Sequence, residues 1–301
     1  MGARGGGAFF VTLPVLLQVA VGGLLMGLIY ALVAAGLSLI FGLMDIVNFA
    51  HGELLMLAMY ATFVLWLFTG LDPLLSVLPV ALVLFVLGVA IYRLLMARAL
   101  SVRFNRGMVQ IFVTFGLAIF IRGAAQFAFS GEFRSISTSW LANRSLDVGG
   151  IFLPLPQLAA GVVCLLAFAG LLAISRTEFG RALEATREDR EAVALIGIDR
   201  DRIFTLGWGL GAATVGIAGA MLATFFYVSP NVGSNFALIA YVTVALGGFG
   251  SLTGALVAGL LIGEVEALSS LVFEPSLKQV GMFGIYLLVL MFRPRGLFGK
   301  I

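Results

Sequence analysis

Residues 9–44 read FFVTLPVLLQVAVGGLLMGLIYALVAAGLSLIFGLM, an apolar run in which Gln18, Tyr30 and Ser38 are among the few polar side chains. As one helix this run would be about 54 Å long, whereas the hydrocarbon core of a bilayer is about 30 Å thick. We therefore expect it to enter a membrane and to break at a cluster of small residues, either 22–27 or 34–36. A removable signal peptide is the weaker alternative, because its apolar region spans only about 7 to 15 residues.

The composition of the whole chain agrees with this run. Hydrophobic residues make up 61% and charged residues 11% of 301 positions, against about 45 to 50% and about 25% in soluble domains. These values exclude soluble, disordered and collagen-like classes and predict an all-α, polytopic membrane bundle, since the apolar runs are too long for barrel strands. The single cysteine, Cys164, excludes an intramolecular disulfide, and a formal charge of +3 gives no indication of nucleic-acid binding.

Further apolar stretches predict the other membrane segments, giving eight to ten in total within a single transmembrane domain, 1–301. They lie at 54–69, 74–92, 107–129, 151–174, 203–227, 236–248, 252–272 and 279–292. The 236–248 stretch runs directly into the glycine-rich segment 247–251, so we expect a half-helix or a re-entrant element there. Glycine pairs at four-residue spacing indicate close helix packing: Gly23 with Gly27, Gly207 with Gly211 and Gly259 with Gly263.

Basic residues predict the orientation. Thirteen of the 18 Lys and Arg residues lie in three segments, 93–106, 176–202 and 293–300, whereas the segments 130–150, 228–235 and 273–278 hold only three. By the positive-inside rule the first set faces the cytoplasm. Ten crossings with both termini cytoplasmic satisfy every loop, and eight crossings require two re-entrant pieces.

The segment 45–53, Asp-Ile-Val-Asn-Phe-Ala-His-Gly-Glu, places two carboxylates, an amide and the only histidine between apolar runs. Charges at the bilayer centre cost about 2.5 to 3.5 kcal/mol each, so such groups face protein or water. Asn48, His51 and Glu53 are therefore candidates for a translocation pathway. The alternative is a cytoplasmic turn whose polar groups cap helix ends. Because His51 has no second histidine or nearby nucleophile, metal-binding and hydrolytic functions are not indicated.

Two more places in apolar sequence could line a pathway. Arg122 lies inside the 107–129 span, at helical spacing from Gln110 and Gln126. Its guanidinium could receive a substrate carboxylate; the less specific interpretation is that it reaches the interface or pairs with an acid. Candidate partners are Asp45, Asp72 and Glu264. The second place is the glycine-rich segment, with Gly247, Gly248 and Gly250 as candidates.

The segment 176–202 holds 13 of the chain's 33 charged residues and is predicted to be a cytoplasmic loop with short helices. A first helix begins near 181, Asp189 is a plausible N-cap of a second helix over 190–196, and Gly197 suits the position just past its end. This second helix has a small apolar face and is suited to a groove in a soluble partner. The alternative is a helix that rests on the lipid surface.

Four stretches resemble the branched-chain amino acid permease family of ABC importers, and within it the LivH-type subunits. They are Asn48-Phe49-Ala50-His51-Gly52-Glu53 (the NFAHGE stretch), Glu191-Ala192-Val193 with Gly197 (the EAA loop), Ala245-Leu246-Gly247-Gly248-Phe249-Gly250-Ser251 (LGGxGS) and Arg293-Pro294-Arg295-Gly296-Leu297-Phe298-Gly299 (the terminal RPxGLfG). Val193 stands where the EAA pattern has alanine. The four occur in the family's order across nearly the whole chain.

The resemblance implies a permease subunit in a bacterial cytoplasmic membrane that imports branched-chain amino acids. Its partners would be a second, LivM-type permease, two cytoplasmic ATPases, an extracytoplasmic solute-binding protein and membrane lipid. ATP and Mg²⁺ would bind the ATPases, and this chain would hold no cofactor; it also lacks a G-x-x-x-x-G-K-[ST] motif. The ATPase-coupling residues would be Asp189, Arg190, Glu191, Ala192, Val193 and Gly197.

Other functions remain open from the sequence. Related permeases move urea, short amides or other small solutes. A self-contained carrier or channel driven by an ion gradient would account equally well for the polar segment 45–53. An intramembrane enzyme is disfavoured because no nucleophile and base occur together.

Overall fold

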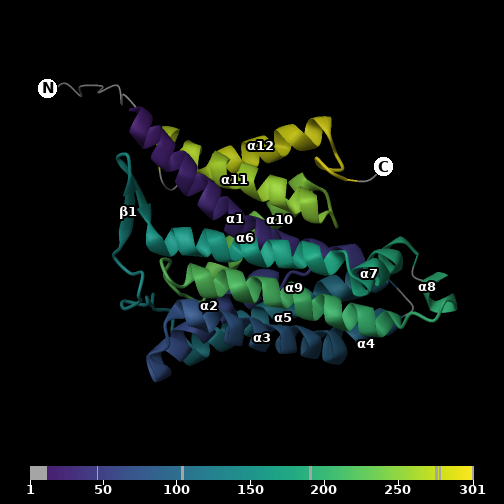
Figure 1. Ribbon diagram of the computed structural model, residues 1–301. Helices are drawn as coiled ribbons and strands as arrows, with labels where there is room; N and C mark the ends of the chain where they lie inside the picture. The colour runs from purple at the N-terminus through teal and green to yellow at the C-terminus, as the bar shows by residue number, and fades with distance from the viewer. Residues whose placement is uncertain are drawn as a thin grey trace, which may run out of the picture.

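The computed structural model describes residues 12–45, 47–102, 105–189, 192–274, 277 and 279–299, with only the backbone at 106. The described residues form an α-helical bundle with one small hairpin (Figure 1). In chain order the elements are α1 (Leu13–Met44), α2 (His51–Thr69), α3 (Pro73–Ile91), the π-helical turn η1 (Tyr92–Met96), α4 (Ala97–Ser101), α5 (Arg106–Phe129), β1 (Ser145–Val148), β2 (Ile151–Pro154), α6 (Leu155–Ser175), α7 (Glu178–Glu188), α8 (Ala192–Leu195), α9 (Arg200–Leu222), α10 (Val232–Gly247), α11 (Leu252–Val272) and α12 (Gln279–Phe292).

The helices confirm a polytopic membrane bundle. Within the described ranges, seven helices are long and apolar enough to cross a membrane, and α10 and α12 are shorter apolar helices. Most bounds lie close to the stretches expected from hydropathy. Two differ: α6 begins at Leu155 because Ile151–Pro154 pairs antiparallel with β1, and α9 already ends at Leu222.

The expected break in the first apolar run is wrong, because α1 continues unbroken for 32 residues. A helix of this length spans about 48 Å and exceeds the bilayer core, a mismatch that tilting can accommodate. In Figure 1 it crosses the bundle obliquely. Two of the glycines in which we expected a break, Gly23 and Gly27, instead bring α1 against α11: a Cβ on Gly27 would lie 2.9 Å from the Gly259 carbonyl oxygen. Small residues here serve packing.

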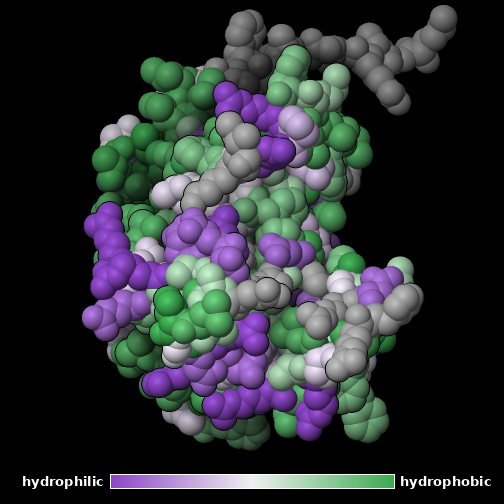
Figure 2. All heavy atoms as spheres, turned by 90° about the vertical axis from the view of Figure 1, so that its right-hand side faces the viewer, coloured by the Kyte–Doolittle hydropathy of each residue, from purple (hydrophilic) through white to green (hydrophobic). Residues whose placement is uncertain are grey.

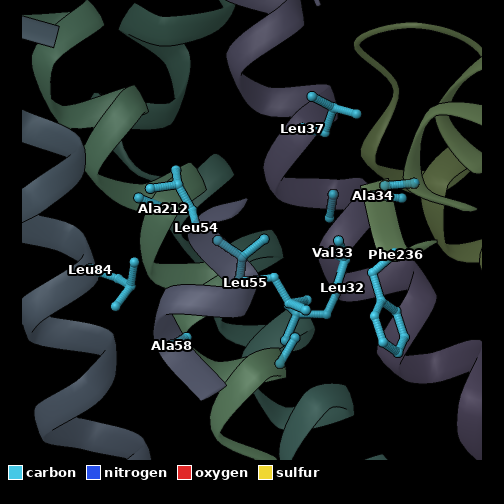
Figure 3. Packing of buried hydrophobic residues seen from close by; sticks show 14 of the residues in the cluster. Leu32, Val33, Ala34, Leu37, Leu54, Leu55, Ala58, Leu84, Ala212 and Phe236 are labelled. Carbon is cyan, nitrogen blue, oxygen red and sulfur yellow. The ribbon is translucent and has the colours of Figure 1, made fainter. Parts of the chain in front are cut away.

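All three glycine pairs pack against neighbouring helices, as predicted. On α11, a Cβ added at Gly263 would lie 2.5 Å from Cα of Gly27. On α9, a Cβ at Gly211 would lie 2.7 Å from the Ile40 side chain, and one at Gly207 would collide with Leu43. α9 also packs against α2 and α3 around Leu55, Ala58, Leu84 and Ala212, which Figure 3 shows together with residues of α1.

The bundle has one polar end, and the three basic segments meet there. η1 reaches α9 through a hydrogen bond from the Tyr92 hydroxyl to Asp201 (3.1 Å). The C-terminal tail bonds to the end of α10, with Leu297 N–H donating to the Leu246 carbonyl (2.8 Å). Figure 2 views the bundle from this end and shows hydrophilic residues gathered on it. We call it the coupling end; the β1–β2 hairpin lies at the opposite end (Figure 1).

The start of α1 and the C-terminal tail lie at opposite ends of the described bundle (Figure 1). Near its start, α1 contacts the hairpin, where the Gln18 side-chain amide donates to the Phe152 carbonyl (3.2 Å). At the other terminus the tail lies at the coupling end.

Candidate functional site

The polar segment after α1 folds back into the bundle instead of forming a surface turn. α1 ends at Met44, followed by Asp45 in a left-handed conformation (φ 57°). α2 begins at His51, whose Nε2 lies 2.9 Å from the carbonyl oxygen of Val33. Val33 is about three turns, or roughly 16 Å, back along α1. The first turn of α2 is therefore deep inside the protein, where Asn48, His51 and Glu53 are at most 2% exposed.

α10 begins at the same depth and runs the opposite way. A Cβ on Gly233, in its first turn, would lie 2.7 Å from the Gly52 carbonyl oxygen and 2.8 Å from Oε2 of Glu53. α2 leads away to the hairpin end, where Asp72 accepts a hydrogen bond from Trp140 N–H (2.6 Å). α10 leads to the coupling end. Two helix N-termini thus meet inside the bundle, and the positive ends of their helix dipoles favour negative charge.

Glu53 and Arg122 form an ion pair at this junction. Nε of Arg122 donates to Oε1 of Glu53 at 3.1 Å, and its Nη2 donates to the same oxygen. The Glu53 side chain is 2% exposed and that of Arg122 is 37% exposed. We expected an acid partner at Asp45, Asp72 or Glu264; the structure instead selects Glu53, because α2 and α5 run side by side from this pair to the stacked rings of Tyr60 and Phe129.

The other polar residues of α5 do not join the pair. Gln110 is 1% exposed, whereas Gln126 is exposed, so the two amides face different surroundings. Sequence reasoning missed Tyr241 on α10. Its hydroxyl donates to the Phe49 carbonyl at 3.1 Å and so holds the segment between α1 and α2 in place. Sequence reasoning also missed Gly52 and Gly233; their signal was glycine beside polar residues at a helix start.

Several buried polar atoms near the junction lack a partner. Within the described chain, Asn48 Nδ2, His51 Nδ1 and Glu53 Oε2 make no hydrogen bond. Most buried polar groups in proteins are paired, so each such atom calls for an explanation. Together they mark a polar interior at the depth where α2 and α10 begin.

Gly247, Gly248 and Gly250 lie elsewhere, at the coupling end. α10, about 24 Å long, separates them from Glu53. Positive φ angles at Gly248 (100°) and Gly250 (77°) shape the loop. Arg187 of α7 donates through Nη1 to the Gly250 carbonyl at 2.7 Å. The structure thus brings this glycine-rich loop to the segment 176–202 instead of to the polar junction.

A cavity of about 280 Å³ lies under the same loop. It is bordered by α1, α6, α7, α9 and the start of α11, and Arg187 and Gly250 line it. Ser38, a buried residue of α1, also lines it, and its hydroxyl has no partner among the described residues. The cavity reaches from the coupling end toward the bundle interior.

The short helices expected in the segment 176–202 are present as α7 and α8. The Asp189 carboxylate accepts from Ala192 N–H (3.0 Å) at the start of α8, and Gly197 follows its end with φ 84°. Arg190 and Glu191 lie outside the described residues. Val193 is buried (3% exposed), so the apolar face expected of the whole helix is in fact made by Leu195 and Ile196, 90% and 73% exposed.

Within the described ranges, no three His, Cys, Asp or Glu residues are grouped so that they could hold a metal ion. Cys164 is buried in α6.

Comparison with known proteins identifies the family. Residues 19–291 match the model of the branched-chain amino acid transport system permease component. The chain is 32% identical to the high-affinity branched-chain amino acid permease BraD of Pseudomonas aeruginosa over 294 residues, covering 94% of this chain and 96% of that protein.

Two Escherichia coli permeases extend the comparison. Identity to LivH is 29% over 298 residues, covering 94% of this chain and 96% of that protein. Identity to LivM is 35% over 150 residues, covering 49% of this chain and 34% of that protein. No solved structure matches. The multi-pass helical bundle and these similarities together show that the chain belongs to the family of permease components of branched-chain amino acid transport systems.

Proposed function

We propose that this chain is a membrane-spanning permease subunit of an ATP-driven importer of branched-chain or related small amino acids. It would reside in a bacterial cytoplasmic membrane with the coupling end inside. It would pair with a second, LivM-type permease and act with two cytoplasmic ATPases and an extracytoplasmic solute-binding protein. ATP and Mg²⁺ would bind the ATPases.

The observation that carries the proposal is the apolar tip of α8. Leu195 and Ile196 project from the polar coupling end and are 90% and 73% exposed. Exposed apolar side chains in a polar surface indicate a binding site for a partner, and a short helix of this kind suits a groove in another protein. Because α7 is bonded to the glycine-rich loop through Arg187, movement of α8 has a direct path into the bundle.

Replacement of Gly197 tests the docking role. Its φ of 84° is incompatible with proline, which requires a φ near −65°, whereas asparagine tolerates this left-handed conformation. We expect Gly197→Pro to abolish ATP-driven uptake while insertion into the membrane persists, and Gly197→Asn to retain most uptake. Normal uptake by Gly197→Pro would refute the docking role.

One observation favours a second candidate, a carrier driven by an ion gradient. α2 and α10 begin inside the bundle, and helices that begin inside the membrane form ion and substrate sites in secondary transporters. The two functions separate in proteoliposomes that contain this chain alone. Transport under an ion gradient without ATPases would favour the carrier, and its absence, with ATP-driven uptake restored by the partner subunits, would favour the importer.

A further inference from the structure

We propose that Glu53 and Arg122 form a binding site for the zwitterionic head of an α-amino acid. Glu53 would accept the substrate ammonium, and Arg122 would donate to the substrate carboxylate. The proposal rests on the proposed transport function and deepens it, because it assigns the two residues that would contact the charged groups of the substrate.

The unused atoms of the pair match a zwitterion. Both donors of Arg122 in the pair bind the same oxygen, Oε1 of Glu53. Oε2 has no hydrogen-bond partner in the described chain, and Nη1 of Arg122 takes no part in the pair. One negatively charged acceptor and one positively charged donor thus remain side by side. An α-amino acid presents the opposite charges, also side by side, and charge-assisted hydrogen bonds of this kind are the strong ones.

A purely structural pair would not leave this arrangement. Burying an ion pair stabilises a protein only when the remaining oxygens and protons are also satisfied. Glu53 is almost fully buried, yet half of its carboxylate is unsatisfied. A ligand group that completes the carboxylate in another state of the transport cycle accounts for this atom.

The site is accessible from the side of Arg122. Arg122 is 37% exposed on α5, a helix whose span is only 28% buried. Gly116 and Gly123 on α5 have no neighbouring atom within 4 Å of an added Cβ. A charged side chain inside a span normally faces water or protein, not lipid. This face of α5 therefore adjoins the pathway or the second permease, and a solute there reaches Arg122 directly.

α10 covers the other half of the site. Its residue Gly233 lies against Oε2 of Glu53, leaving no room for a ligand in the present arrangement. The opposite end of α10 leads into the loop that Arg187 holds. A shift of α10 would therefore expose Oε2 to the substrate ammonium, and the coupling end is placed to cause that shift.

Thiol labelling of the complete transporter in nanodiscs tests the site. Cys164, the only cysteine, is replaced by alanine, and Ser234→Cys places one thiol in the first turn of α10. We expect leucine to slow labelling of this thiol. Leucinamide, which lacks the carboxylate, and 4-methyl-2-hydroxypentanoate, which lacks the ammonium, should protect at least tenfold more weakly, since each loses one charged hydrogen bond.

Variants in the same background assign the contacts. Glu53→Gln and Arg122→Lys should each raise the half-protecting leucine concentration about tenfold or more. Glu264→Gln, which removes a carboxylate from α11, is the matched control and should not. The site is refuted if all three solutes protect the thiol equally, or if leucine does not protect it. These two outcomes do not depend on whether the Glu53 and Arg122 variants fold. Unchanged protection in both variants also refutes the site.

ATP-driven leucine uptake by the same preparation separates this proposal from the proposed function. A transporter that pumps leucine but lacks the protection pattern refutes only the site. Uptake that needs no ATPase subunits refutes the importer, whatever the protection pattern.

Discussion

Replacement of Arg187 should uncouple ATP hydrolysis from transport. The Arg187 side chain bridges three parts of the protein: it belongs to α7, donates to the Gly250 carbonyl at 2.7 Å, and passes the end of α1, where a Cβ on Gly42 would lie 3.3 Å from its Cδ. Glycine at both positions permits this close approach. Arg187→Gln shortens the side chain and removes the charge that strengthens the bond.

The size of the effect follows from this one bond. A hydrogen bond to a charged group contributes about 1.5 to 3 kcal/mol, and partial exposure of Arg187 reduces this to about 1 to 2 kcal/mol. Such a loss changes the population of the linked state by a factor of about 5 to 30. We therefore expect the amount of substrate moved per ATP hydrolysed to fall by a factor in that range, while ATP hydrolysis continues.

The assay measures uptake and ATP hydrolysis in the same proteoliposomes containing the complete transporter. Arg181→Gln is the matched control, because Arg181 lies on the same helix but is exposed, and it donates to a carbonyl of its own segment, that of Arg176, at 3.2 Å. An unchanged ratio in Arg187→Gln, or an equal fall in Arg181→Gln, would show that α7 does not act through Gly250.

Three further variants test the packing and the surfaces. Gly259→Ala should lower the free energy of unfolding in detergent by about 1 to 3 kcal/mol, because its Cβ would lie 2.5 Å from the α1 backbone; Gly22→Ala, with no atom within 4 Å, should not, and equal stability of the two would contradict this packing. The double variant Leu195→Ser, Ile196→Ser should weaken ATPase binding at least tenfold in a pull-down titration without changing thermal stability, whereas unchanged binding would exclude α8 as the contact. Tyr30→Phe removes a buried hydroxyl that donates to Oε2 of Glu266 on α11 at 2.6 Å. It should lower the free energy of unfolding by about 0.6 to 1.7 kcal/mol in the same measurement. An unchanged free energy of unfolding would mean that this bond adds nothing to stability.

The membrane bundle and its spans could be predicted from the sequence because they depend on local composition. A run of apolar residues must be helical in lipid wherever it lies in the chain, and most of the observed helices begin and end near the expected positions. The caps of α8 were also predictable: Asp189 and Gly197 act on neighbours within a few residues, where sequence distance and spatial distance agree.

The candidate site was only partly predictable, because its geometry joins distant segments. Glu53 and Arg122 are 69 positions apart, and each appeared as a polar residue in an apolar context without any indication that the two would meet. The glycine-rich loop lies at the coupling end beside Arg187, a neighbour that its sequence did not indicate. Glycine shows that the backbone must turn or approach something closely; it does not show what lies on the other side.

The sequence by itself therefore determined the environment of this protein, the class of its fold and the ends of its short helices, since hydrophobic free energy and capping act on residues close in the chain. Tertiary structure alone decided that α1 remains unbroken and that α2 and α10 begin face to face in the interior. It also decided with which carboxylate Arg122 forms an ion pair. These features depend on which helix surfaces fit together, and that fit is a property of side chains brought into contact only when the whole bundle is assembled.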